Sequence, residues 1–185
     1  MFTIDKNVTN EIVINKSKFI TYIYKVSNDN DVFNILDNLK REYKDATHYC
    51  YAYIIGNVKR FNDDGEPKMT AGIPILSVLE GGNLNNVLAV VIRYFGGTKL
   101  GTGGLIRAYS SSVSEALNIV NIIPLKKEYK CKIRFKYEDI NKVNYILKDY
   151  KITSKEFNQD VIYEFIYEEN NYPDKLDSYL IKWFI

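Results

Sequence analysis

A glycine-rich segment at residues 95–107 contains the residue types best suited to binding an anion. It reads Phe-Gly-Gly-Thr-Lys-Leu-Gly-Thr-Gly-Gly-Leu-Ile-Arg and stands between an apolar run and a helical stripe of apolar residues. The first amides of a helix lack partners, and the helix dipole favours negative charge beside them. We therefore predict a nucleic-acid or anion-binding site formed by Arg93, Gly96, Gly97, Lys99, Gly101, Gly103, Gly104 and Arg107.

The same glycines also fit a structural role. Nine of the ten glycines lie between Asn62 and Ser112, and glycine permits positive φ and close backbone approach. The spacing of a Walker A loop is absent, and Ile106 stands where a dinucleotide motif has its third glycine. An anion site and a tight strand-to-helix connection therefore both stay open.

An acidic turn precedes this segment and contains Asp63, Asp64 and Glu66. Three carboxylates so close together could hold a hard cation such as Mg²⁺. Asn-Asp-Asp-Gly is also ordinary turn chemistry, in which short side chains bond to their own backbone. A third alternative is that the acids pair with Arg93 or Arg107 and shape the groove, as its acidic rim, without contacting any ligand. We assign no metal and no cofactor.

His48 is the only histidine, so any reaction that needs a histidine base must use it. Cys50 shares its face of an expected strand and is the nearest candidate nucleophile. A single histidine at the start of a strand is more simply a structural hydrogen-bonding residue. We assign no catalytic residue.

The apolar periodicity predicts two α+β domains, at residues 1–124 and 125–185, joined by the Pro-Leu-Lys-Lys-Glu linker at 124–128. In the first domain we expect strands at 8–15, 18–26, 48–55, 58–61 and 87–95, and helices at 30–43, 71–79 and after residue 104. In the second we expect a strand at 129–136, a helix at 139–149, strands at 150–158 and 161–168, and a helix at 173–182. This order indicates a ferredoxin-like unit whose final strand is short or missing.

Composition excludes several classes of protein. The chain has 25 Lys and Arg against 23 Asp and Glu, which argues against bulk electrostatic binding of nucleic acid but allows a local basic patch. Two distant cysteines and one histidine argue against a zinc site or a disulfide framework. No apolar run is long enough to span a membrane, and the N-terminal stretch has acids where a signal peptide is basic and then apolar. We therefore expect a cytoplasmic protein.

Four motifs of the chain resemble the IMPACT/YigZ family. They are His48-x-Cys-x-Ala52, the Asn62–Pro67 turn, Thr70-Ala-Gly-x-Pro74 and, most specifically, the unbroken string from Arg93 to Tyr109. The resemblance covers the whole chain. Lys68-Met69 departs from the small Ser-Gly pair expected after Glu-Pro, and Ile54 stands where many members have arginine.

The resemblance implies an N-terminal two-layer α/β domain similar to the second domain of a small-subunit ribosomal protein. It implies a C-terminal ferredoxin-like domain similar to the fifth domain of elongation factor G. Eukaryotic members regulate translation initiation under stress, and for bacterial members the resemblance implies nucleic-acid or ribosome binding without an established reaction.

We therefore predict a translation-associated regulatory or binding protein that contacts RNA, the ribosome or a ribosome-associated protein through the glycine-rich groove. The alternative is an enzyme acting on a phosphorylated small molecule. In that alternative the glycine-rich loop holds the phosphate, and Asp63, Asp64 or Glu66 serves as metal ligand or base.

Overall fold

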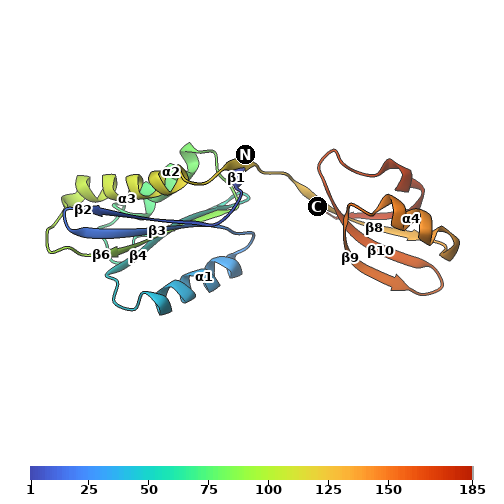
Figure 1. The fold of residues 1–185 in the computed structure, drawn as a ribbon, viewed down its shortest axis with the longest axis horizontal. Coiled ribbons are helices and arrows are strands. Elements are labelled where there is room, and N and C mark those ends of the chain that lie inside the picture. Colours follow the sequence, from blue (N-terminus) through green and yellow to red (C-terminus); the bar gives the residue numbers. More distant parts are fainter. Residues whose placement is uncertain (185) are drawn as a thin grey trace. The chain divides into compact units, whose positions relative to one another are not determined.

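The chain folds into two compact units, Met1–Leu125 and Lys126–Ile185. The computed structural model describes the backbone of residues 1–184 and the side chains through residue 181 (Figure 1). The strands and helices of the first unit are β1 (Phe2–Ile4), β2 (Val8–Ile14), β3 (Ser17–Lys25), α1 (Asp29–Glu42), β4 (His48–Ile55), β5 (Val58–Asn62), α2 (Gly72–Gly81), β6 (Val87–Tyr94), α3 (Gly101–Leu117) and β7 (Ile122–Pro124). The predicted α+β class is confirmed.

A five-stranded antiparallel sheet of order β2-β3-β6-β4-β5 forms the centre of the first unit. Figure 1 shows α2 and α3 on one face of this sheet and α1 on the other. The structure thus adds a second helical layer to the two layers expected. Strand β1 lies apart from this sheet and pairs with β7.

Strand β6 is the central strand, and its sequence shows why. Seven of its eight residues are buried, because helices cover both faces of the sheet around it. Strands covered on both faces are near-continuously apolar. Arg93, near the end of β6, is the one charged residue of this strand, and it is buried with 4% of its surface exposed.

The glycine-rich segment contains less loop than expected. Helix α3 already begins at Gly101, so Gly101, Gly103 and Gly104 lie in its first turn, which corrects the prediction of a loop through residue 104. Gly96 is in the true loop and touches the β2–β3 turn. A Cβ at Gly96 would lie 2.0 Å from the carbonyl carbon of Lys16. The structural role of glycine therefore holds at this position.

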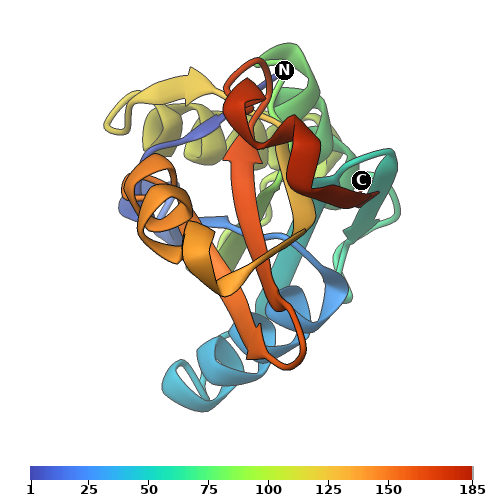
Figure 2. The same ribbon diagram turned by 90° about the vertical axis from the view of Figure 1, so that its right-hand side faces the viewer.

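The second unit has its own sheet and core. Its elements are β8 (Glu128–Phe135), η1 (Tyr137–Asp139), α4 (Ile140–Ile146), β9 (Lys151–Phe157), β10 (Val161–Glu168), η2 (Asp174–Tyr179) and β11 (Leu180–Phe184). The antiparallel strand order β11-β8-β10-β9 is that of a ferredoxin-like unit. Figure 2 turns this unit toward the viewer, with α4 in orange and the segment from η2 onward in dark red.

Two predictions for the second unit need correction. The expected helix at 173–182 is a short 3₁₀ helix, because the chain becomes extended from residue 180 onward and pairs with β8. The helix expected at 139–149 is also shorter, because α4 ends at Ile146. The final strand, expected to be short or missing, is present and short, as the five-residue β11.

The contact at Gly96 leads to a stability prediction. Gly96→Ala places a methyl group into backbone, so we expect a loss of about 3 kcal/mol in the free energy of unfolding, at the upper end of overpacking costs. Gly81→Ala in α2 meets nothing within 4 Å, and we expect it to be neutral or to stabilise by up to about 1 kcal/mol. Urea denaturation measures both variants, and equal stabilities would contradict the structural role of Gly96.

Candidate functional site

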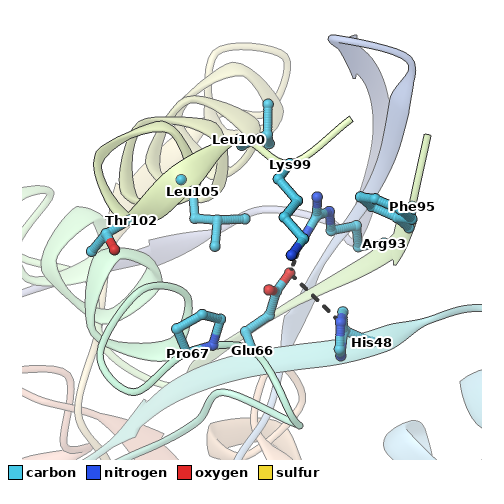
Figure 3. A pocket seen from close by; sticks show the side chains of 10 residues that line it. His48, Glu66, Pro67, Arg93, Phe95, Lys99, Leu100, Thr102 and Leu105 are labelled. Atoms are coloured by element: carbon cyan, nitrogen blue, oxygen red, sulfur yellow. Dashed lines mark hydrogen bonds and ion pairs between the residues drawn. The ribbon is translucent and has the colours of Figure 1, made fainter. Parts of the chain in front are cut away.

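A cavity of about 400 Å³ opens between the acidic turn, the end of β6 and the beginning of α3. Its lining has a polar side and an apolar side, as Figure 3 shows. His48, Glu66, Arg93 and Lys99 form the polar side, and Pro67, Phe95, Leu100 and Leu105 are the apolar residues. Gly101 and Thr102 bring the first turn of α3 to the cavity. The acidic turn and the glycine-rich segment, far apart in sequence, thus meet here.

A buried ion pair between Glu66 and Arg93 forms the floor of the cavity. Arg93 Nη1 donates to Glu66 Oε1 over 2.5 Å, and both side chains are about 95% buried. Arg93 Nη2 donates to the hydroxyl of Ser17 over 3.2 Å. The hydroxyl of Tyr109 donates to the same Glu66 oxygen over 2.8 Å. Glu66 therefore joins the acidic turn to β6 and α3. Its pairing with Arg93 is the kind of contact that the third alternative for the acids predicted.

Two polar atoms of this network have no protein partner within the described part of the chain. Every polar contact of the Glu66 carboxylate goes to Oε1, so Oε2 accepts no hydrogen bond. Arg93 Nε is buried and has no hydrogen-bond partner. Arg93 Nε is a buried donor without a partner, which costs free energy. Glu66 Oε2 is not one of the described buried atoms that lack a partner, so it is accessible from the cavity.

Asp63 and Asp64 play structural roles and do not line the cavity. The Asp63 carboxylate accepts the backbone amides of Ala71 and Gly72 at the beginning of α2, over 3.0 and 2.8 Å. It thereby caps a helix whose own N-cap side chain makes no bond. The Asp64 carboxylate accepts the amide of Tyr49 over 2.7 Å. The predicted acidic rim is therefore reduced to Glu66 at the cavity.

His48 faces Glu66 from the start of β4. Its Nδ1 lies 2.7 Å from the backbone carbonyl of Asp64 and must donate to it, because a carbonyl oxygen only accepts. Nε2 lies 3.9 Å from Glu66 Oε1. That distance is too long for a hydrogen bond. His48 and Glu66 therefore lie side by side at the cavity without a direct hydrogen bond.

Cys50 lies beneath this network and is not suited to nucleophilic catalysis. It is fully buried, with Sγ 2.9 Å from the carbonyl of Asp63 and 3.4 Å from the hydroxyl of Tyr109. Burial raises the pKa of its thiol well above the usual range, and burial likewise raises the pKa of Tyr109. Tyr109 therefore stays a neutral hydroxyl that can donate to Glu66.

The predicted cations are placed in three different ways. Lys99 is exposed, lines the cavity and makes no ion pair with any described residue. Arg93 lines the cavity too, but its charge is engaged by Glu66. Arg107 is exposed and lines a second, smaller depression of about 190 Å³ with Asn15, Leu100 and Gly104. The cavity therefore has one uncompensated cation, not the three expected.

The predicted glycines also lie in different places. Gly101 lines the cavity and Gly104 lines the smaller depression, whereas Gly96, Gly97 and Gly103 line neither. Sequence reasoning did not single out Ser17, Thr102 or Leu105, because these residue types are ordinary in strands and helices. The motif string running from Arg93 to Tyr109 was a signal for Tyr109.

The described residues contain no group of three or more histidine, cysteine or acidic side chains arranged to hold a metal ion. None of the helices in this part of the chain has the length and apolar composition needed to cross a membrane.

Fold and site define a two-unit α+β protein with a cavity built on a buried Arg–Glu pair at the beginning of a glycine-rich helix. Residues 15–117 match the Impact N-terminal domain family. The chain is 40% identical to the IMPACT family member YvyE of Bacillus subtilis over 173 residues, covering 91% of this chain and 80% of that protein. It is 40% identical over 109 residues to YigZ of Escherichia coli, covering 56% of this chain and 53% of YigZ.

A crystal structure of a hypothetical protein superposes with a TM-score of 0.72 at 31% identity and covers 89% of this chain and 84% of that one. The chain belongs to the IMPACT family, which includes YigZ.

The Glu66–Arg93 pair leads to a second stability prediction. Arg93→Met leaves the Glu66 carboxylate buried without its cation, and breaking a buried pair in this way costs about 3–5 kcal/mol. The double variant Arg93→Met/Glu66→Leu removes both charges, and we expect it to recover a large part of that loss. Urea denaturation of the two variants tests this, and equal stability of Arg93→Met and the unmodified chain would contradict it.

Burial of the two cysteines leads to a reactivity prediction. The thiolate is the reactive form, and burial raises the pKa of Cys131 to about 11 and that of Cys50 further. At pH 8 we expect neither cysteine of the folded chain to be alkylated by iodoacetamide, and both to react in urea. Mass spectrometry counts the added groups, and rapid labelling of Cys50 in the folded chain would contradict its placement.

Proposed function

We propose that this chain is a translation-associated regulatory protein that binds single-stranded RNA through a basic rim around the cavity. The basic rim consists of Lys16, Lys68, Lys99 and Arg107. All four are exposed, and none makes an ion pair with a described residue. The position of four such cations beside one cavity and its glycine-rich segment is the observation that carries the proposal.

Each rim residue lies next to the cavity or the glycine-rich segment. Lys99 lines the cavity, and Lys68 follows the cavity residue Pro67. Lys16 is in the turn that touches Gly96. Arg107 shares its depression with Leu100, which also lines the cavity.

Exposed cations elsewhere in this unit are paired in some cases and unpaired in others. Arg41 pairs with Asp37 on α1. Lys6 and Lys25 make no ion pair with a described residue, but they lie away from the cavity. Unpaired cations at one place attract an anionic partner, and phosphate contacts supply most of the sequence-independent affinity for nucleic acid. A chain with nearly balanced total charge can therefore hold a local phosphate-binding surface.

Membership of the IMPACT family supports the translation-associated part of the proposal, because eukaryotic members of this family regulate translation initiation. The enzyme alternative receives less support. Two of its three proposed metal ligands or bases, Asp63 and Asp64, already accept backbone amides.

Salt dependence tests the proposal. We expect Lys99→Gln/Arg107→Gln to weaken binding of a fluorescein-labelled RNA oligonucleotide, because two phosphate contacts are lost. The slope of log K against log salt should become shallower by about 1.4, since each contact to a single strand contributes about 0.7. Fluorescence anisotropy at several salt concentrations measures both quantities.

The matched control is Lys6→Gln/Lys25→Gln, which removes two exposed cations that make no ion pair with a described residue. Lys25 pairs with Val87 at the end of the sheet opposite the cavity, and Asn7, next to Lys6, bonds to the amide of Lys25. We expect the control to bind like the unmodified chain. Equal affinities and slopes for the two double variants would contradict the basic rim as the RNA site.

A further inference from the structure

We propose that the cavity recognises the ribose 2′-hydroxyl of a ribonucleotide, with Glu66 Oε2 as the acceptor and the beginning of α3 with Lys99 holding the adjacent phosphate. The inference rests on the proposed function, because it names the nucleotide chemistry that the basic rim would bring to the cavity. It goes further by assigning a group that distinguishes RNA from DNA.

The floor of the cavity presents a hydrogen-bond acceptor to a ligand. Glu66 is 92% buried and lines the cavity, and its Oε2 has no partner among the described residues. His48 Nε2 lies 3.9 Å from Glu66 Oε1 on the same side. Figure 3 shows the Glu66 carboxylate directed toward the open space between Pro67, Leu105 and Lys99. A ligand that displaces water from Oε2 must therefore supply a donor.

Charge balance indicates that this donor is neutral. Arg93 already compensates Glu66, so an ammonium group would add a second cation beside the buried guanidinium. A hydroxyl satisfies Oε2 without adding charge. Carboxylates accept sugar hydroxyls in this manner where dinucleotide-binding proteins hold the ribose 2′-hydroxyl.

The mouth of the cavity is suited to binding an anion. Gly101 and Thr102 place the first turn of a 17-residue helix there, and the N-cap residue Leu100 has no side-chain bond to those amides. Lys99 adds an uncompensated charge. A helix N-terminus with a nearby cation suits a phosphate group.

A ribonucleotide combines both features, because its 2′-hydroxyl stands next to the 3′-phosphate. The remaining wall, formed by Pro67, Leu100 and Leu105, is apolar and suits the carbon face of a sugar or base. DNA supplies the phosphate but not the donor, so the 2′-hydroxyl is what a protein can use to tell the two apart.

The test compares one sequence as RNA, DNA and 2′-O-methyl RNA, using the unmodified full chain and anisotropy at fixed salt. A hydrogen bond to a charged group predicts that RNA binds about tenfold to a hundredfold more tightly than DNA. The 2′-O-methyl oligonucleotide lacks the donor and should bind like DNA or more weakly. Equal binding of RNA and DNA would overturn the inference while leaving the basic rim intact.

Two variants assign the effect to its residues. Glu66→Gln should bring the RNA-to-DNA affinity ratio close to one, whereas Lys99→Gln should weaken both ligands and leave the ratio unchanged. Thermal melting establishes that each variant is folded. If Glu66→Gln does not fold, the oligonucleotide comparison on the unmodified chain still decides. A ratio unchanged in folded Glu66→Gln would overturn the assignment to Glu66.

The ligand chemistry could come from an RNA chain or from a free nucleotide. Thermal shift with adenosine 3′-monophosphate and its 2′-deoxy counterpart separates the two sources. Stabilisation by the ribonucleotide alone, with no binding of RNA, would retain the hydroxyl site and contradict the proposed RNA function. Binding of neither RNA nor the ribonucleotide would overturn the inference.

Discussion

The buried pair of Glu66 and Arg93 is the interaction on which the candidate site depends. It fixes the acidic turn to the central strand, and Tyr109 attaches α3 to the same carboxylate oxygen. Removing two charges from water is costly, and their attraction compensates only where hydrogen bonds satisfy the remaining atoms. In this network the Ser17 hydroxyl accepts from Arg93 and the Tyr109 hydroxyl donates to Glu66. Within the described residues Glu66 Oε2 accepts no hydrogen bond and Arg93 Nε donates none. The pair thus uses only part of its hydrogen-bonding capacity.

This arrangement divides the charges of the site into two sets. In the inner set, the opposite charges of Glu66 and Arg93 cancel. The pair therefore forms the floor of the cavity without giving the cavity a net charge. The outer set, the basic rim, consists of exposed cations without ion pairs to the described residues. Electrostatic attraction over some distance comes from the outer set, and discrimination at contact would come from the inner one, because hydrogen bonds in a water-poor cavity depend strongly on geometry.

The two units differ in where their charged residues lie and in what these residues do. The described cavity with its buried ion pair lies in the first unit, whose residues 15–117 match the family domain. In the second unit the ferredoxin-like sheet carries its own core around Ile133, Tyr163 and Phe165. Its charged pairs, such as Lys136 with Asp160, are largely on the surface and contribute little to stability. The match to the family domain therefore falls on the part of the chain that also contains the candidate site.

The sequence alone determined the α+β class, most of the elements and the family, because apolar periodicity and the motif string from Arg93 to Tyr109 are local patterns. It also indicated that residues 62–112 contribute most of the candidate site, although His48 comes from outside this stretch. It could not decide what each charged residue does. Asp63 caps α2, Asp64 binds β4 and Glu66 binds Arg93, although the three stand within four positions in one turn. Only the tertiary structure separates them, because a carboxylate's role depends on which amides and cations the fold brings within about 3 Å of it. For the same reason Arg93 and Lys99, both predicted as anion-binding residues, differ in the structure: one is buried in a pair, and the other is exposed.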